Sequence, residues 1–195
     1  MAAFDDFIDL QTAVVESVGR ADIVDVMPRL VQLAETVMSR KLRCNDQITT
    51  ATLTFAAGVA TLPADVAEII GMYRADGYEY IQQPLQSVRT AGSALYYAIS
   101  GLTAISYGLT GTAILQYYAK LPTISGTTTA TNWLLVKYPH AYLYAVSLEA
   151  AKHLRDVDMA QTFRVLMDGE MMDIAADDHA QRYSRARVRV AGNTP

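Results

Sequence analysis

The feature that most constrains the fold of this sequence is a change of periodicity between its ends and its middle. Both ends repeat their apolar residues every three or four positions, which is the period of an amphipathic helix. The segment ITTATLTF, residues 48–55, instead alternates, with Leu53 and Phe55 on one face and threonines on the other. The chain must therefore combine packed helices with a group of strands, each with an apolar face to bury.

Two helices are predicted within residues 1–43. Apolar residues recur there at helical spacing in two runs, which a break at Gly19 separates. Pro28 suits the first turn of the second helix, where no backbone donor is needed. The basic SRKLR segment, residues 39–43, suits a helix C-terminus, because cations there meet the negative end of the helix dipole.

Residues 45–130 are predicted to form five to seven short antiparallel strands. Charged residues become fewer in this segment and Thr, Gly, Tyr and Ile dominate, a composition that favours strands with a half-buried surface. Residues 75–77, Ala-Asp-Gly, lie between two strand-like runs and predict a hairpin. Residues 84–90 suit a short helix, and glycines separate the runs that follow.

Helical periodicity returns at about Thr131. Residues 141–148 are apolar nearly all round, which is typical of the central helix of a bundle, and Pro139 is predicted to start or kink that helix. Residues 157–182 predict a further amphipathic helix containing Gly169. Its acidic residues are expected to form a solvated outer face rather than a metal site: Asp168, Glu170, Asp173, Asp177 and Asp178.

The sequence therefore predicts an α+β fold: an antiparallel helical bundle of about four helices, with an inserted small antiparallel β subdomain and an extended C-terminal arm. The bundle is expected in residues 1–43 and 131–184, the β subdomain in residues 44–130 and the arm in residues 185–195. The bundle core is expected to contain Leu33, Trp133, Tyr142, Val146, Phe163 and Met167.

No catalytic, cofactor-binding or metal-binding pattern stands out. The three histidines are widely spaced, and the sequence lacks a phosphate-binding loop and a G-x-S-x-G turn. Cys44 is the single cysteine, which excludes a disulfide framework. The net charge of -4 argues against a general nucleic-acid binder. Acidic residues stand where a signal peptide would be basic, and no apolar run reaches the about 18 residues of a membrane span.

The last residues of the chain alternate between arginine and apolar side chains. The arginines are Arg185, Arg187 and Arg189, and the apolar residues between and after them are Ala186, Val188 and Val190. This pattern favours an arm that adds a strand to another chain, with backbone hydrogen bonds supplying affinity and the arginines setting orientation. The alternative is a solvated tail that binds nothing.

Three blocks of the sequence, in this order and spacing, resemble the head-to-tail adaptor proteins of tailed bacteriophages, also called head-completion or tail tubular ring proteins. The first is MPRLVQLAETVMSRKLR, residues 27–43, and the second is LPADVAEI, residues 62–69. The third and strongest runs from YYAKLP through NWLL to YPHAYLYAVSLEAAKHLRD, residues 117–156. The resemblance extends over residues 27–190.

The resemblance implies a structural virion protein without catalysis or cofactor, made in the cytoplasm of the host bacterium. Its copies would form a ring, commonly of twelve, that docks under the portal ring, completes the head and meets a downstream tail or nozzle protein. DNA would pass through the lumen without sequence-specific binding, and no membrane is involved. The docking arm would be Arg185, Arg187, Val188, Arg189 and Val190. The alternatives are another neck or tail component that does not contact the portal, and a small α+β hydrolase.

Overall fold

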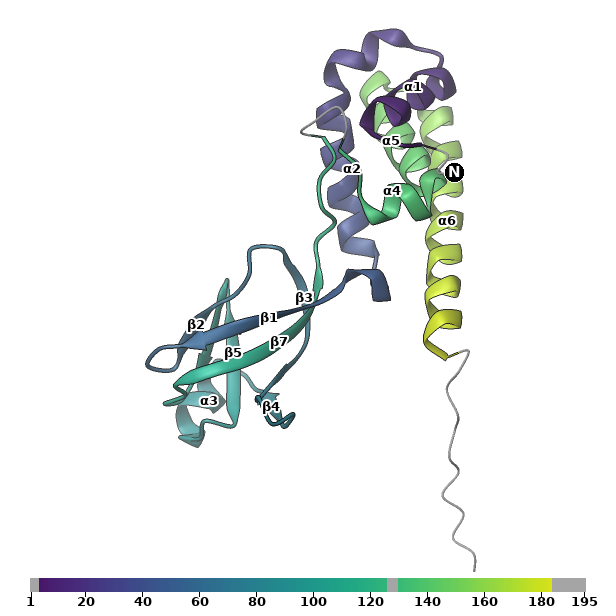
Figure 1. The fold of residues 1–195 in the computed structure, drawn as a ribbon. Helices are drawn as coiled ribbons and strands as arrows, with labels where there is room; N and C mark the ends of the chain where they lie inside the picture. The colour runs from purple at the N-terminus through teal and green to yellow at the C-terminus, as the bar shows by residue number, and fades with distance from the viewer. Residues whose placement is uncertain (1–3, 126–129, 184–195) are drawn as a thin grey trace, which may run out of the picture. The chain divides into compact units, whose positions relative to one another are not determined.

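The computed structural model describes residues 4–125 and 130–183, which form two compact units (Figure 1). The helical unit contains the described residues up to Asn45 and those from Leu121 onward. The sheet unit contains residues 46–120. Each unit has its own apolar core, so each is described separately below.

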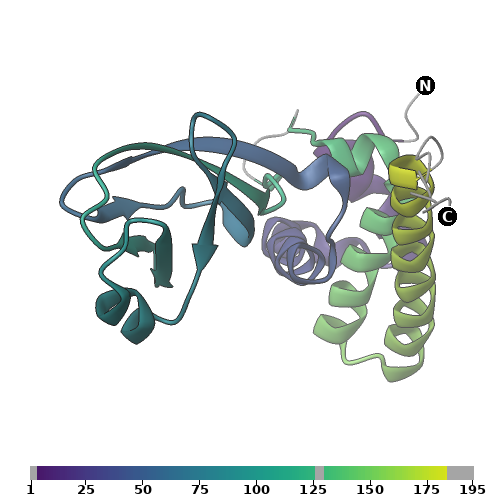
Figure 2. The same cartoon turned by 90° about the horizontal axis from the view of Figure 1, so that it is seen from below.

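The helical unit is built around α5. Its elements are α1 (Phe7–Val18), the 3-10 helix η1 (Ala21–Val26), α2 (Met27–Lys41), α4 (Trp133–Lys137), α5 (Pro139–Leu154) and α6 (Val157–Tyr183). Helix α5 contacts α1, α2, α4 and α6, and it lies between α2 and α6 (Figure 2). Its central position follows from its sequence, because residues 141–148 are apolar nearly all round and leave no polar face to solvate along this stretch.

Local chemistry fixes where these helices begin and end. The Asp6 carboxylate caps α1 by accepting hydrogen bonds from the amides of Ile8 and Asp9, at 2.8 and 3.2 Å. Gly19 ends α1 in the left-handed conformation that glycine adopts at no steric cost. Pro139 occupies the first turn of α5, where its missing donor is not needed.

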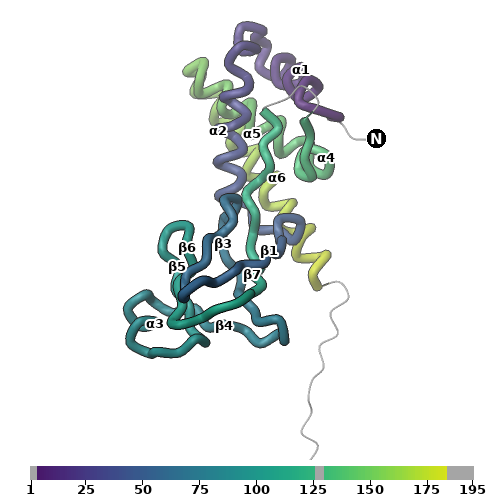
Figure 3. The backbone as a smooth tube through the Cα atoms, turned by 60° about the vertical axis from the view of Figure 1, so that its left-hand side comes forward, coloured from purple at the N-terminus to yellow at the C-terminus, as the bar shows by residue number. Residues whose placement is uncertain are grey.

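The sheet unit is a strongly curved seven-stranded sheet that also carries a short helix (Figure 3). Its elements are η2 (Asn45–Gln47), β1 (Ile48–Phe55), β2 (Val59–Thr61), β3 (Val66–Tyr73), β4 (Glu79–Gln82), α3 (Leu85–Ala91), β5 (Tyr96–Ser100), β6 (Thr103–Ser106) and β7 (Gly111–Ala119). The strand order is β1-β7-β3-β4-β5-β6-β2. Inward-facing side chains such as Leu53, Met72 and Leu115 fill its interior, with 3% exposure or less.

A tight turn brings the two ends of this strand order together. Ala56 and Val59 pair as a β-bridge, with reciprocal backbone hydrogen bonds of 3.0 Å. The two residues between them, Ala57 and Gly58, have φ angles of 49° and 82°, as a primed hairpin turn requires. Because this turn joins β1 directly to β2, the sheet is nearly closed and has little free edge.

The predicted fold class is wrong. Instead of a bundle of about four helices with a small inserted antiparallel β subdomain, the described residues form six α-helices and a seven-stranded, barrel-like sheet. Pro139 separates α4 from α5, which adds a helix to the bundle. The sheet is not wholly antiparallel, because α3 crosses between β4 and β5 and these strands run parallel. The predicted arm lies outside the described residues.

Along the described stretches, no helix combines the length and the apolar character that a membrane span requires.

Candidate interaction surfaces

The titratable side chains of the described residues do not converge on one place. They include no group of three or more His, Cys, Asp or Glu that could hold a metal ion. His140 stacks on Tyr144 with ring centroids 5.9 Å apart, and the ring centroids of His179 and Tyr183 are 4.6 Å apart. Cys44 is buried. The exposed faces of the two units are candidate surfaces for contact with other molecules.

One buried polar network joins several elements of the helical unit. Oε1 of Glu35, on α2, accepts hydrogen bonds from the amide of Ile124 at 2.8 Å and the hydroxyl of Tyr142 at 3.1 Å. Nδ2 of Asn132 donates to the Tyr142 hydroxyl at 2.6 Å and to the carbonyl of Pro122 at 2.7 Å. The network thus ties the returning segment at residues 121–124 to both α2 and α5.

Burial dominates the ionisation of this network. It raises the pKa of the Glu35 carboxyl, although the hydrogen bonds from Ile124 and Tyr142 act in the opposite direction. Burial also raises the pKa of Tyr142, and the nearby Glu35 charge adds to this shift. No buried side-chain polar atom in the described part of the chain lacks a partner, so the network is a structural clamp.

The solvent-facing side of α6 is apolar and uncharged at its centre. Phe163, Met167 and Ile174 face the core. The opposite side carries residues that recur every three or four positions, and we call this set the α6 stripe: Thr162, Val165, Gly169, Met172 and Ala176. Val165 is 67% exposed and Met172 is 72% exposed. A shallow depression near the start of the stripe is lined by Asp158, Gln161, Thr162, Val165 and Leu166.

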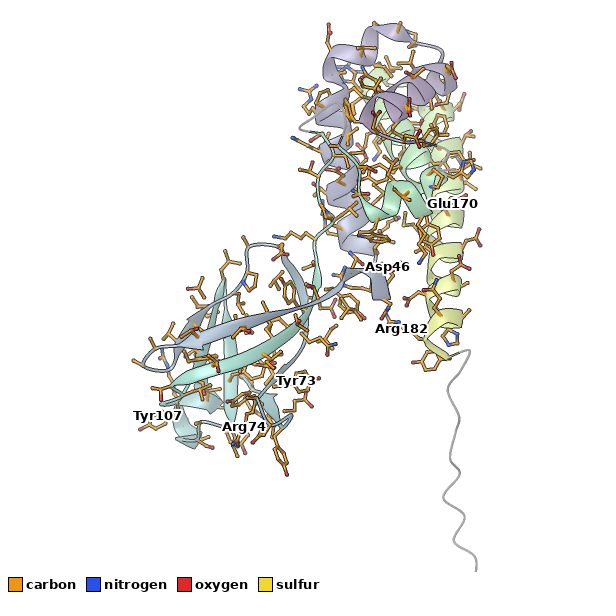
Figure 4. The ribbon with its side chains drawn as sticks, viewed as in Figure 1. Asp46, Tyr73, Arg74, Tyr107, Glu170 and Arg182 are labelled. Atoms are coloured by element: carbon orange, nitrogen blue, oxygen red, sulfur yellow. The ribbon has the colours of Figure 1, made fainter. Side chains whose placement is uncertain are left out.

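The acidic residues of α6 from Asp168 onward are divided between exposed positions, Asp173 and Asp177, and partly buried ones. Asp168, Glu170 and Asp178 are partly buried. Asp168 accepts a 2.6 Å bond from Lys41, and Asp178 pairs with Arg182 at 2.7 Å. Figure 4 labels Glu170 and Arg182 on this helix. None of these five acidic residues belongs to the α6 stripe, and the exposed Asp173 lies beside it.

A second exposed face lies on α2. It consists of Arg29, Leu33, Thr36 and Arg40, and we call it the α2 face. Leu33 is 47% exposed there and does not belong to the core. The acidic residue of this helix, Glu35, points inward, so the α2 face is basic.

The other predicted core residues lie within the helical unit. Tyr142 and Val146 are fully buried, Met167 is 3% exposed and Phe163 is 8% exposed. Trp133 is partly buried and packs against the same core cluster. The predicted arm residues Arg185, Arg187, Val188, Arg189 and Val190 lie outside the described residues.

The sheet unit also exposes large apolar side chains. They are Val59, Ile70, Tyr78, Ile81, Leu95, Leu102, Tyr107 and Ile114. Tyr107 lies directly after β6 and is 55% exposed (Figure 4). These side chains are spread over several strands and turns, unlike the single line of the α6 stripe.

Exposed apolar side chains on both units favour contacts with other proteins. Residues 5–191 match the family described as SU10 adaptor protein, and the chain belongs to this family. It is therefore a structural adaptor of bacteriophages, a component of the virion that associates with other phage head and tail proteins, and its family is not a class of enzymes. None of the curated proteins matches the sequence.

Proposed function

We propose that this chain forms the adaptor ring between the portal and the tail, which completes the head and continues the DNA channel. The observation that carries the proposal is the family match over residues 5–191, which covers both the helical unit and the sheet unit. We take the ring to contain about twelve copies, as in the adaptors that the sequence resembles.

The surfaces of the helical unit are compatible with a ring. Heterologous contacts around a ring need two different faces on each subunit. The α6 stripe is uncharged and mostly apolar, and the α2 face is basic, so the two faces differ in chemistry. The sheet unit, with its own exposed apolar residues, offers further surface for a portal or tail partner.

The charge of the chain suits a DNA conduit. A basic lumen would release counterions from the phosphate backbone and retain the DNA. With a net charge of -4, the ring as a whole repels DNA, so the genome can pass without sequence-specific binding.

The C-terminal segment is the part that we assign to the portal. Its arginines alternate with apolar residues, which suits addition of a strand to the edge of a partner's sheet. The opposite side of the ring is then left for a downstream tail or nozzle protein.

Co-sedimentation with the portal ring of the same phage tests this proposal. The full-length chain and a version ending at Ser184 are compared, and we expect the full-length chain to bind and the shorter version to lose most binding. Equal binding of both would leave the adaptor role in place and remove the arm from it. If neither binds the portal and the chain sediments with a tail protein instead, the portal role is wrong and the chain is another neck component.

A further inference from the structure

We propose that the α6 stripe of one copy packs against the α2 face of a neighbouring copy, so that helix-to-helix contacts of this kind link the ring. The inference rests on the proposed ring and names the surfaces that would hold it together. It assigns both faces of the contact to described residues of the helical unit.

The first argument is the composition of the α6 stripe. The five residues of the α6 stripe are uncharged, although α6 as a whole carries six acidic residues and two arginines, and the exposed Arg164 and Asp173 lie to either side of the stripe. Val165 and Met172 expose about two thirds or more of their surface and lie on one line of the helix. An uncharged line of side chains that runs for about four turns of a helix suits a contact that excludes water.

The second argument is Gly169, in the middle of the stripe. Glycine is the least favourable residue inside a helix apart from proline, because it loses the most backbone freedom. A Cβ atom added at Gly169 would meet nothing within 4 Å, so packing within the chain does not require glycine there. Close packing of a helix from another copy would require glycine, because a side chain at the point of contact would keep the two helices apart.

The third argument is the chemistry of the α2 face. Leu33 projects from it with 47% exposure, between Arg29 and Arg40. On α6, Asp158 lies one turn before the stripe and Asp173 lies beside it, and both are exposed. An apolar centre with basic ends therefore meets an apolar centre with an acidic border, and this complementarity selects a second copy as the partner.

The fourth argument is the position of the two faces. Helix α5 packs against both α2 and α6, and the α2 face and the α6 stripe are exposed on the sides of their helices opposite the buried residues. One copy cannot join its own two faces, and two copies that share one such contact still leave one face of each kind open. Repetition of the same contact then adds further copies until a ring closes.

Cysteine cross-linking tests the inference directly. The variant Leu33→Cys with Met172→Cys is assembled on its portal ring, checked for ring formation by native mass spectrometry, and treated with a short bis-maleimide reagent. We expect covalent dimers, trimers and larger species, because each copy carries one cysteine for the contact with each of its two neighbours. The single variants should give none, and the native Cys44 is buried and present throughout. A matched control combines Leu33→Cys with Thr12→Cys, which is exposed on α1.

The outcomes separate this inference from the proposed function. Rings that form without these covalent species would overturn the contact and leave the adaptor role standing. Dimers from Met172→Cys alone would also overturn it, because they would mean that α6 pairs with α6. If the wild-type chain forms no ring with or without the portal, the proposed function fails, and the contact fails with it.

A second pair of variants does not depend on cross-linking. Gly169→Leu adds bulk in the centre of the stripe, where the monomer has free space. Ala175→Leu adds bulk at an exposed position of the same helix outside the stripe. We expect ring formation to weaken at least tenfold for Gly169→Leu and to stay within twofold for Ala175→Leu. Equal behaviour of the two variants would contradict the contact.

Discussion

The hydroxyl of Tyr142 donates a 3.1 Å hydrogen bond to Oε1 of Glu35, although the two residues lie on different helices, α5 and α2. The same carboxylate oxygen accepts from the backbone amide of Ile124. Residues 121–124 carry the chain from the end of the sheet unit back to α4, so this pair of bonds fixes the start of the returning segment. The Ser39 hydroxyl accepts from the amide of Leu121 at 3.1 Å and holds the same segment one turn further along α2.

Removal of the Glu35 side chain should destabilise the helical unit. In Glu35→Ala the Ile124 amide and the Tyr142 hydroxyl lose their acceptor inside the protein, and we expect a loss of about 2–3 kcal/mol in unfolding free energy. Glu35→Gln keeps a carbonyl oxygen at this position and should lose less. Urea denaturation of the three proteins measures the difference. An alanine variant as stable as the wild type would mean that the network contributes nothing.

The stability of the fold should depend on the charge of Glu35. Burial raises the pKa of this carboxyl above its ordinary value of 4.5, so the folded state holds the proton more tightly than the unfolded state. Protonation of Glu35 then stabilises the fold at pH values below about 4.5, and this contribution is lost as the pH rises through the raised pKa. As the pH rises through the raised pKa of Glu35, we expect the unfolding free energy of the wild type to fall relative to that of Glu35→Gln. Unfolding curves at a series of pH values measure the difference, and a constant difference would contradict the prediction.

Two substitutions in the turn between β1 and β2 should have opposite effects on the stability of the sheet unit. Gly58 has a φ of 82°, and an added Cβ would collide with the carbonyl oxygen of Ser106, so Gly58→Ala should destabilise the sheet unit by about 2 kcal/mol or more. Ala57 has a φ of 49°, a conformation that asparagine tolerates better than alanine. Ala57→Asn should therefore stabilise the same turn by up to about 1 kcal/mol. Thermal unfolding compares the two, and equal effects would mean that the turn has another conformation.

Much of the local structure could be predicted from the sequence, because it follows from neighbouring residues. The alternation of residues 48–55 gave the bounds of β1 correctly. The hairpin predicted at residues 75–77 joins β3 to β4, and the amide of Arg74 donates to the carbonyl of Tyr78 at 2.8 Å. Pro139 starts a helix, as proline in a first turn does.

The arrangement of these elements could not be predicted in the same way. Strand order depends on pairings between distant residues, and the parallel pairing of β4 with β5 depends on the crossover through α3. The bond between Asp168 and Lys41 could not be predicted either, because the two residues lie far apart in the sequence. The α6 stripe was not predicted, because the acidic residues of α6 led to the interpretation of a solvated outer face. Its signal is in the sequence, since Val165, Gly169 and Met172 follow helical spacing on the side opposite Phe163.

Gly169→Ala should separate the stability of the monomer from its assembly. Alanine has a higher helix propensity than glycine, and a Cβ at this position meets no atom within 4 Å, so the variant should gain up to about 1 kcal/mol in unfolding free energy. If a neighbouring helix packs across Gly169, the same methyl group should hinder the contact and weaken ring formation. Chemical denaturation measures the first effect, and native mass spectrometry of the chain with its portal ring measures the second. A variant that gains stability and assembles as well as the wild type would mean that no helix crosses the stripe at this glycine.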